Sequence, residues 1–172
     1  SELVEALPAR GLRHLEITGM QVGGALPEAL GDKCAGAECV DLDSLGLTGG
    51  VLASLGKCTK LKSLLLWGNQ LDGPISDELG QCGELEVLDL SENQLTGGVP
   101  ASLGKCAKLE TLALSENQLE GAVPAAELAK LTALEVLELV GNEGLTITAS
   151  GAQALKEALP NATLCLPTEV AG

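Results

Sequence analysis

The chain repeats a similar segment every 24 or 25 residues. The copies begin at Leu12, Ala37, Leu61, Leu85, Leu109 and Leu134, so six units cover residues 12–158. Repetition on this scale is typical of a stacked architecture in which each unit contacts only its neighbours. We therefore predict a single domain over residues 1–172, with an N-terminal cap at 1–11, repeats at 12–158 and a C-terminal cap at 159–172.

Four of the six units start with the pattern L-x-x-L-x-L, and the first two keep it with other apolar residues at Ile17, Ala37 and Val40. The last two leucines are two positions apart, so in an extended segment they point to the same side while their neighbours point to the other. A strand this short cannot bury its leucines alone, but stacked copies form a parallel sheet over a continuous core. The chain must then turn and return, and we expect short 3₁₀ or irregular returns after turns at Gly49, Gly73, Gly97 and Gly121.

The last unit differs from the others. Ser150 precedes the segment 151–159, which we predict as a capped amphipathic helix ending before Pro160. Its apolar face would hold Ala154, Leu155, Ala158 and Leu159. Residues 161–166 follow with apolar Leu164 and Leu166, which predicts one more, truncated strand.

The shared pattern L-x-x-L-x-L-x-x-N-x-L-x-G-x-x-P-x-x-L-G resembles the leucine-rich repeat family, in the form common in plant receptor ectodomains and polygalacturonase inhibitors. The last unit resembles the helical repeats of ribonuclease-inhibitor-like proteins. The resemblance implies an α/β solenoid: a horseshoe with a parallel sheet on its concave face and terminal helical caps. It also implies a non-enzymatic module that binds a protein or peptide. A structural or scaffolding segment of a larger receptor-like protein, or an enzyme inhibitor, are the alternatives.

Asparagine occupies the same position in four successive units. A side-chain amide there can bond to backbone groups that the turns leave unpaired, so we predict a structural ladder. Met20 and Leu45 take this position in the first two units, which predicts that the ladder is incomplete at that end. The four residues are Asn69, Asn93, Asn117 and Asn142.

Cysteine recurs in the same way, and we interpret it as a small buried hydrophobic residue with a free thiol. The chain has no C-x-x-C pair and one histidine, His14, so we expect no metal and no other cofactor. No nucleophile motif or phosphate-binding loop accompanies His14, so we expect no enzymatic activity. The recurring cysteines are Cys34, Cys58, Cys82 and Cys106.

Charge restricts the partners. With 24 acidic and 10 basic residues the net charge is −14, which would repel a nucleic acid backbone. No apolar run approaches the roughly 18 to 20 residues that would insert into a membrane. The N-terminal segment lacks the paired cysteines typical of secreted plant repeats, which favours a cytoplasmic location, although the triplet from Asn161 to Thr163 is a glycosylation sequon. The oligomeric state stays open.

The outward positions of the strands and their exit loops form the candidate binding surface. Eleven of the 24 acidic residues fall there, and we expect this surface to attract a basic protein or peptide. The third unit instead has apolar Leu65 and Trp67, which we interpret as anchors for the ligand. The eleven acids are Glu16, Glu38, Asp41, Asp43, Glu86, Asp89, Glu92, Glu110, Glu116, Glu135 and Glu138. The predicted ligand-binding residues are Trp67, Leu65, Glu16, Asp41, Asp43, Glu86, Asp89, Glu110 and Glu138.

Overall fold

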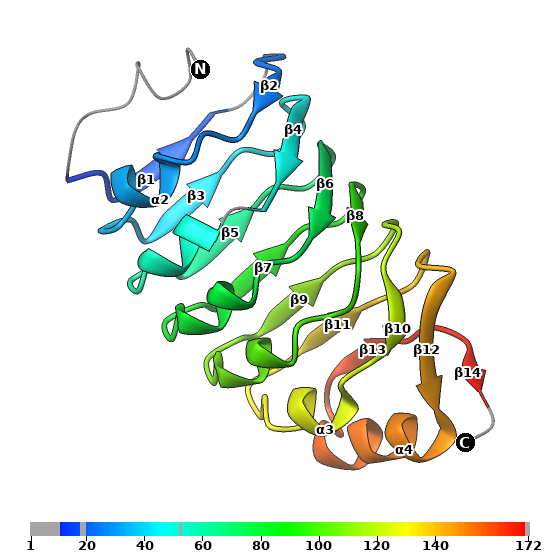
Figure 1. The fold of residues 1–172 in the computed structure, drawn as a ribbon. Coiled ribbons are helices and arrows are strands. Elements are labelled where there is room, and N and C mark those ends of the chain that lie inside the picture. The colour runs from blue at the N-terminus through cyan, green and yellow to red at the C-terminus, as the bar shows by residue number, and fades with distance from the viewer. Residues whose placement is uncertain (1–10, 18–19, 52, 171–172) are drawn as a thin grey trace.

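The computed structural model describes residues 11–17, 20–51 and 53–170. Its repeats stack in sequence order, with the first and last described strands at opposite ends of the stack (Figure 1). One side of the stack is a parallel sheet of seven strands, which we call the main sheet. Its strands are β1 (His14–Glu16), β3 (Cys39–Asp41), β5 (Ser63–Leu65), β7 (Val87–Asp89), β9 (Thr111–Ala113), β11 (Val136–Glu138) and β13 (Thr163–Cys165). The predicted solenoid is confirmed, and β13 is the extra strand predicted within 161–166.

The turns that follow the main sheet also pair with one another, which the sequence analysis did not predict. They form one sheet of β2 (Gly24–Ala25), β4 (Leu47–Gly50), β6 (Gln70–Pro74) and β8 (Gln94–Thr96), and a second sheet of β10 (Glu120–Ala122), β12 (Gly144–Thr148) and β14 (Glu169–Val170). Stacking at a nearly constant spacing brings equivalent backbone groups side by side, so they pair. The turn glycines have positive φ, for example 70° at Gly73, as their role in the turns requires.

Helical segments form the third side of the stack. They are α2 (Leu30–Lys33), the 3₁₀ helices η1 (Ala53–Lys57), η2 (Asp77–Gln81) and η3 (Ala101–Lys105), then α3 (Ala125–Leu128) and α4 (Ala149–Ala158). The predicted 3₁₀ returns are therefore present. Successive segments approach closely: a Cβ on Gly80 would lie 2.5 Å from the carbonyl oxygen of Ser102 in the next repeat.

The C-terminal helix corrects one detail of the sequence analysis. Its N-cap is Thr148, whose side chain accepts a hydrogen bond from Gly151 N at 3.1 Å, and not Ser150. Thr148 and Ser150 both have a hydroxyl that can cap a helix. Thr148 is the last residue of β12, and the helix begins directly after it. The buried stripe of the helix accordingly contains Ala152, Leu155 and Leu159, while the predicted Ala154 and Ala158 are exposed.

Leucine fills the core between the three sides, and the four ladder asparagines cross it beside the turns. Each asparagine is 3% to 8% exposed. Asn93 is representative: its Nδ2 donates to the carbonyls of Leu66 and Leu90 at 3.0 and 3.1 Å, and its Oδ1 accepts from Leu71 N at 3.0 Å. The side chain thus joins its own repeat to the one before it. The ladder begins at Asn69, with Leu45 buried in the preceding repeat.

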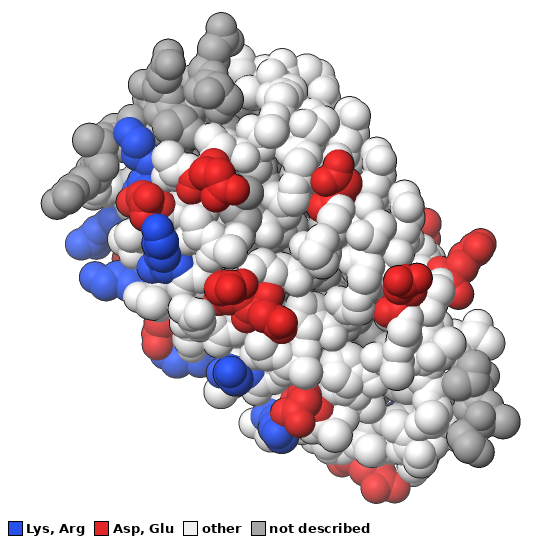
Figure 2. Space-filling view, viewed as in Figure 1, with Lys and Arg blue, Asp and Glu red and all other residues white. Residues whose placement is uncertain are grey.

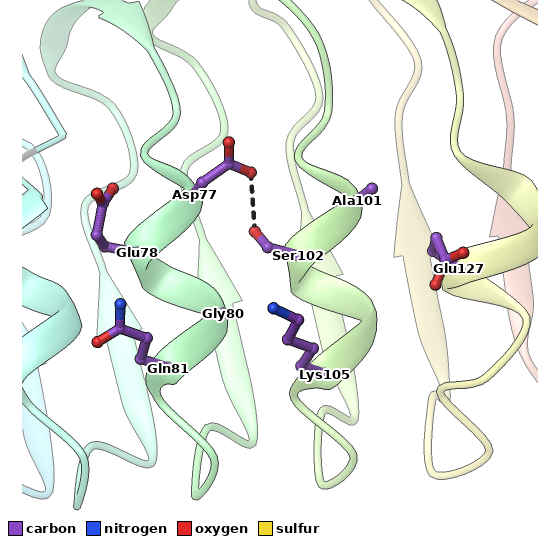
Figure 3. Close-up of a pocket in the computed structure, with 8 residues that line it drawn as sticks. All are labelled: Asp77, Glu78, Gly80, Gln81, Ala101, Ser102, Lys105 and Glu127. Carbon is purple, nitrogen blue, oxygen red and sulfur yellow. Dashed lines mark hydrogen bonds between the residues drawn. The ribbon is translucent and has the colours of Figure 1, made fainter.

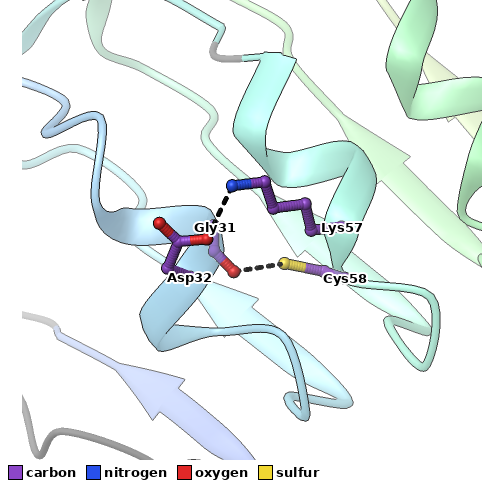
Figure 4. A network of polar contacts seen from close by, with 4 residues as sticks. All are labelled: Gly31, Asp32, Lys57 and Cys58. Atoms are coloured by element: carbon purple, nitrogen blue, oxygen red, sulfur yellow. Dashed lines mark hydrogen bonds and ion pairs between the residues drawn. The ribbon is translucent and has the colours of Figure 1, made fainter.

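The recurring cysteines are buried and free. Three of them contact the preceding repeat, as Figure 4 shows for Cys58, whose Sγ donates to the carbonyl of Gly31 at 3.6 Å. Cys82 and Cys106 contact Leu55 and Leu79 in the same way. Burial raises the pKa of Cys58 to about 12, so this thiol stays protonated at neutral pH.

The part of the chain that the structure describes includes no helix with the length and apolarity to cross a membrane. The predicted N-terminal cap at 1–11 lies outside the described residues, except for Gly11.

Candidate ligand-binding surface

The register of the main sheet places its outward side chains in two columns. The first column is neutral apart from His14 and contains Cys39, Ser63, Val87, Thr111, Val136 and Thr163. The second contains Glu16, Asp41, Leu65, Asp89, Ala113, Glu138 and Cys165. Leu65 therefore lies on β5 directly between Asp41 on β3 and Asp89 on β7. At about 4.8 Å per strand, the two aspartates are about 10 Å apart across the leucine.

A third column continues beyond the ends of the strands. Backbone bonds from Ser44, Gly68, Glu92 and Glu116 to the next repeat align Asp43, Trp67, Ser91, Ser115 and Val140. Trp67 is 38% exposed, and its backbone N–H donates to Asp43 Oδ1 at 2.6 Å. Asp41 and Asp89 accept backbone bonds two residues on, from Asp43 N at 3.3 Å and Ser91 N at 2.9 Å. These bonds orient the carboxylates beside the tryptophan.

We call Leu65, Trp67, Asp41, Asp43 and Asp89 the central patch. Partial burial raises the pKa of Asp43 to about 6, the hydrogen bond from Trp67 N lowers it, and the charges of Asp41 and Asp89 raise it. The negative charges of the three aspartates therefore repel one another. A cation placed among them would relieve this repulsion and would lie next to an aromatic ring that can also attract it.

The remaining predicted residues are not all close to the central patch. Glu16 and Glu138 lie in the second column, but on β1 and β11, two and three strands away from Leu65. Glu86 and Glu110 come directly before β7 and β9, at the edge where the strands begin. Lys62 precedes β5 at the same edge, so a basic side chain interrupts the acidic ones there. The structure therefore divides the predicted set into a compact centre and a wider acidic surround.

Two apolar residues escaped the sequence analysis as parts of this surface. Together with Trp67, Met20 and Val140 are the exposed large hydrophobic residues of the described chain, at 60% and 41% exposure. Both lie at the edge where the strands end. Met20 lines a groove of about 280 Å³ with Gln21, Asp43 and Ser44, and Val140 lines one of about 420 Å³ with Leu166 and Pro167. Two features of the sequence could have indicated that these residues belong to the surface. Met20 stands where later repeats have the ladder asparagine, and Val140 stands at the repeat position of Trp67.

The helical side has a different character. Lysine and arginine side chains gather along its edge in Figure 2, and the ion pairs Lys57–Asp32, Lys108–Glu84 and Lys130–Glu127 lie there. A groove of about 580 Å³ runs between η2, η3 and α3 (Figure 3). Ser102 Oγ donates to Asp77 Oδ1 across it at 3.0 Å. None of the predicted ligand-binding residues lines this groove.

Metal ligation has no candidate site in residues 11–17, 20–51 and 53–170, where no group of three His, Cys, Asp or Glu side chains could hold an ion. The carboxylates of the central patch do not form such a group.

Comparison with known proteins identifies the repeats. The leucine-rich repeat model matches residues 59–119 and 84–143. No curated protein sequence matches the chain significantly. Solved structures do match, and the first is the ectodomain of the Arabidopsis thaliana receptor kinase GASSHO1/SCHENGEN3 in complex with CASPARIAN STRIP INTEGRITY FACTOR 2. It is 34% identical with a TM-score of 0.77, over 84% of this chain and 17% of that one.

Two further structures give the same result. The plant peptide hormone receptor RGFR1 in complex with RGF2 is 30% identical, with a TM-score of 0.81 over 91% of this chain and 24% of that one. The Arabidopsis receptor kinase HAESA, in complex with the peptide hormone IDA and the co-receptor SERK1, is 32% identical, with a TM-score of 0.71 over 78% of this chain and 22% of that one. The chain thus spans about a fifth of the length of these receptor chains.

The comparisons correct the predicted location. A cytoplasmic location is wrong, because the similar structures are ectodomains of plant membrane receptors and point to an extracellular one. The prediction relied on cysteine usage. The recurring thiols are packed in the core against backbone carbonyls, a role that does not depend on the compartment. The chain is a leucine-rich repeat protein, and its repeats are of the plant receptor type.

Proposed function

We propose that this chain binds a basic protein or peptide on its main sheet, with the central patch as the principal contact. The observation that carries the proposal is the half-buried Leu65, which has an aspartate on each neighbouring strand, beside the exposed Trp67, which follows Asp43 in its column. An apolar stem would pack on the leucine and the indole, and a lysine or arginine head group would reach the carboxylates. Interface energy is often concentrated in such an aromatic centre surrounded by polar groups.

The wider acidic residues take a different role in this proposal. Glu16, Glu86, Glu110 and Glu138 are too far from Trp67 to share one ligand side chain with it. They extend the negative potential over the sheet and would accelerate the approach of a positively charged ligand. Their effect should weaken as salt shortens the Debye length from about 10 Å at 0.1 M to about 3 Å at 1 M.

The size of the main sheet indicates the form of the ligand. Seven strands at about 4.8 Å give a width of about 29 Å, which an extended peptide of about nine residues can cross at 3.3 Å per residue. The strands have three residues each, so the sheet is narrow in the other direction. An extended segment suits this surface better than a globular domain, and the grooves at Met20 and Val140 could take its outer side chains.

The comparisons support the class of ligand. RGFR1 and HAESA were solved in complex with RGF2 and with the peptide hormone IDA, respectively. This chain covers about a fifth of the length of those receptors. A peptide partner for the whole protein is therefore proposed here and does not follow from the comparisons. We propose a binding role with no catalytic step.

A displayed library of random nonapeptides tests this function while leaving the sequence of the ligand open. We expect the selected peptides to be rich in lysine and arginine. Trp67→Ala should weaken their binding at least tenfold, and Asp41→Asn with Asp89→Asn should weaken it and flatten its salt dependence.

The matched control is Asp72→Asn with Glu120→Gln. It removes the same charge from exposed positions on β6 and β10 and should leave binding within twofold. Selected peptides without basic residues, or equal losses in the control, would contradict the proposal.

A further inference from the structure

We propose that Asn161 is an N-glycosylation site. Of the five asparagines in the chain, Asn161 alone is followed two positions later by serine or threonine, in the triplet Asn161, Ala162 and Thr163. This triplet meets the acceptor requirement, because its middle residue is not proline. The proposal follows from the extracellular location and is independent of the proposed ligand.

The fold separates this asparagine from the other four. The ladder asparagines are 3% to 8% exposed, and their amides are hydrogen-bonded to backbone groups. Asn161 lies instead in the turn between α4 and β13, where both it and Thr163 are exposed. The ladder asparagines have a structural role in four successive repeats, whereas Asn161 is available to a modifying enzyme and a glycan there would extend into solvent.

The reaction requires a lipid-diphosphate-linked oligosaccharide as the donor. The Nδ2 of Asn161 would attack C1 of its first sugar, and an N-glycosidic bond would form as the bond from C1 to the diphosphate oxygen breaks. The lipid diphosphate leaves, and the amide nitrogen loses one proton. No redox step is involved.

The position of the site is compatible with ligand binding on the main sheet. Asn161 precedes β13, at the edge of the sheet where the strands begin. Trp67, Met20 and Val140 lie at the other edge, where the strands end. The central patch lies on or after β3, β5 and β7, and β7, its nearest strand, is three strands away from β13 in the sheet. A glycan on Asn161 would therefore cover the last repeat and leave the central patch open.

The test is the intact mass of the full chain secreted from plant cells behind a signal peptide. We expect a mass above that of the polypeptide, which a peptide-N-glycosidase active on plant glycans removes while converting the asparagine to aspartate. Asn161→Gln and Thr163→Ala should each abolish the extra mass, and Thr163→Ser should retain it because serine also completes the triplet.

A positive control shows whether the host cells can glycosylate this protein. In the double variant Lys130→Asn with Asn161→Gln, a new triplet forms with Thr132 in an exposed turn after α3. A glycan on this control, together with a wild-type protein at polypeptide mass, would overturn the proposal. Persistence of the extra mass in Asn161→Gln would also overturn it.

Discussion

The ladder asparagines have nearly equal burial, yet the structure predicts unequal effects when they are replaced. In Asn69→Ala, the N–H groups of Leu45 and Leu47 lose Asn69 Oδ1, and the carbonyl of Leu42 loses its contact with Nδ2. The Leu42 carbonyl has no second donor from a preceding asparagine, because Leu45 occupies that ladder position, and the two N–H groups lose their ladder acceptor. Three buried groups are left unpaired.

Asn93→Ala leaves one group unpaired. Leu71 N–H loses Asn93 Oδ1, but the carbonyl of Leu66 keeps its bond from Asn69 and that of Leu90 keeps its bond from Asn117. At the lower value of about 1 kcal/mol for each orphaned group, Asn69→Ala costs about 3 kcal/mol and Asn93→Ala about 1 kcal/mol. The difference of about 2 kcal/mol is roughly a thirtyfold change in the folding equilibrium.

Urea unfolding measures these costs, with far-UV circular dichroism as one probe and the fluorescence of the single tryptophan as the other. The double variant adds a second test. Without Asn69 and Asn93, the carbonyl of Leu66 has lost both donors, so the cost should exceed the sum of the single variants by about 1 to 3 kcal/mol. If Asn93→Ala costs as much as Asn69→Ala, or if the double variant is additive, this account of the ladder is wrong.

Three further predictions concern the helical side, the core and the central patch. Gly80→Ala should destabilise the protein by about 1 to 3 kcal/mol because its Cβ would meet the Ser102 carbonyl, whereas Gly83→Ala, with no atom within 4 Å, should change the unfolding midpoint little. Alkylation of the native protein near pH 8 should modify only Cys39 and Cys165, which are partly exposed, because the four recurring thiols are buried in the core. Mass spectrometry would refute this by finding the four modified before unfolding. The folded-state pKa of Asp43 is raised, so ionisation at this residue costs stability as the pH rises from about 4 through 6. Asp43→Asn should therefore stabilise the protein at pH 7 but not near pH 3, and equal effects at both pH values in thermal unfolding would exclude this explanation.

The sequence alone determines the main sheet. A spacing of two between apolar residues specifies one buried face, and this pattern recurs every 24 or 25 residues from β1 to β11 and once more 27 residues later in β13. The ladder follows from the same periodicity. These features are local and repeated, so one correct assignment carries over to every repeat.

The boundaries of the elements required the structure. Periodicity alone could not decide whether Glu86 belongs to the strand face or to the edge before β7, nor whether Thr148 or Ser150 caps the last helix. The pairing of the turns into further sheets also escaped prediction, because those bonds join residues more than twenty positions apart whose alignment depends on how the repeats stack.

The candidate site depended most on tertiary structure. The sequence singles out Trp67 and Leu65 as apolar exceptions in an acidic pattern. Only the parallel register shows that Asp41 and Asp89 border Leu65. Only the tertiary structure shows that Asp43 accepts a hydrogen bond from the backbone N–H of Trp67 and that Met20 lines a groove with Asp43. The repeat pattern determines the local structure of each residue within its own strand and turn. A binding surface, by contrast, is formed by side chains from different repeats. Their distances are determined by stacking, which brings residues 24 positions apart to within about 5 Å of one another.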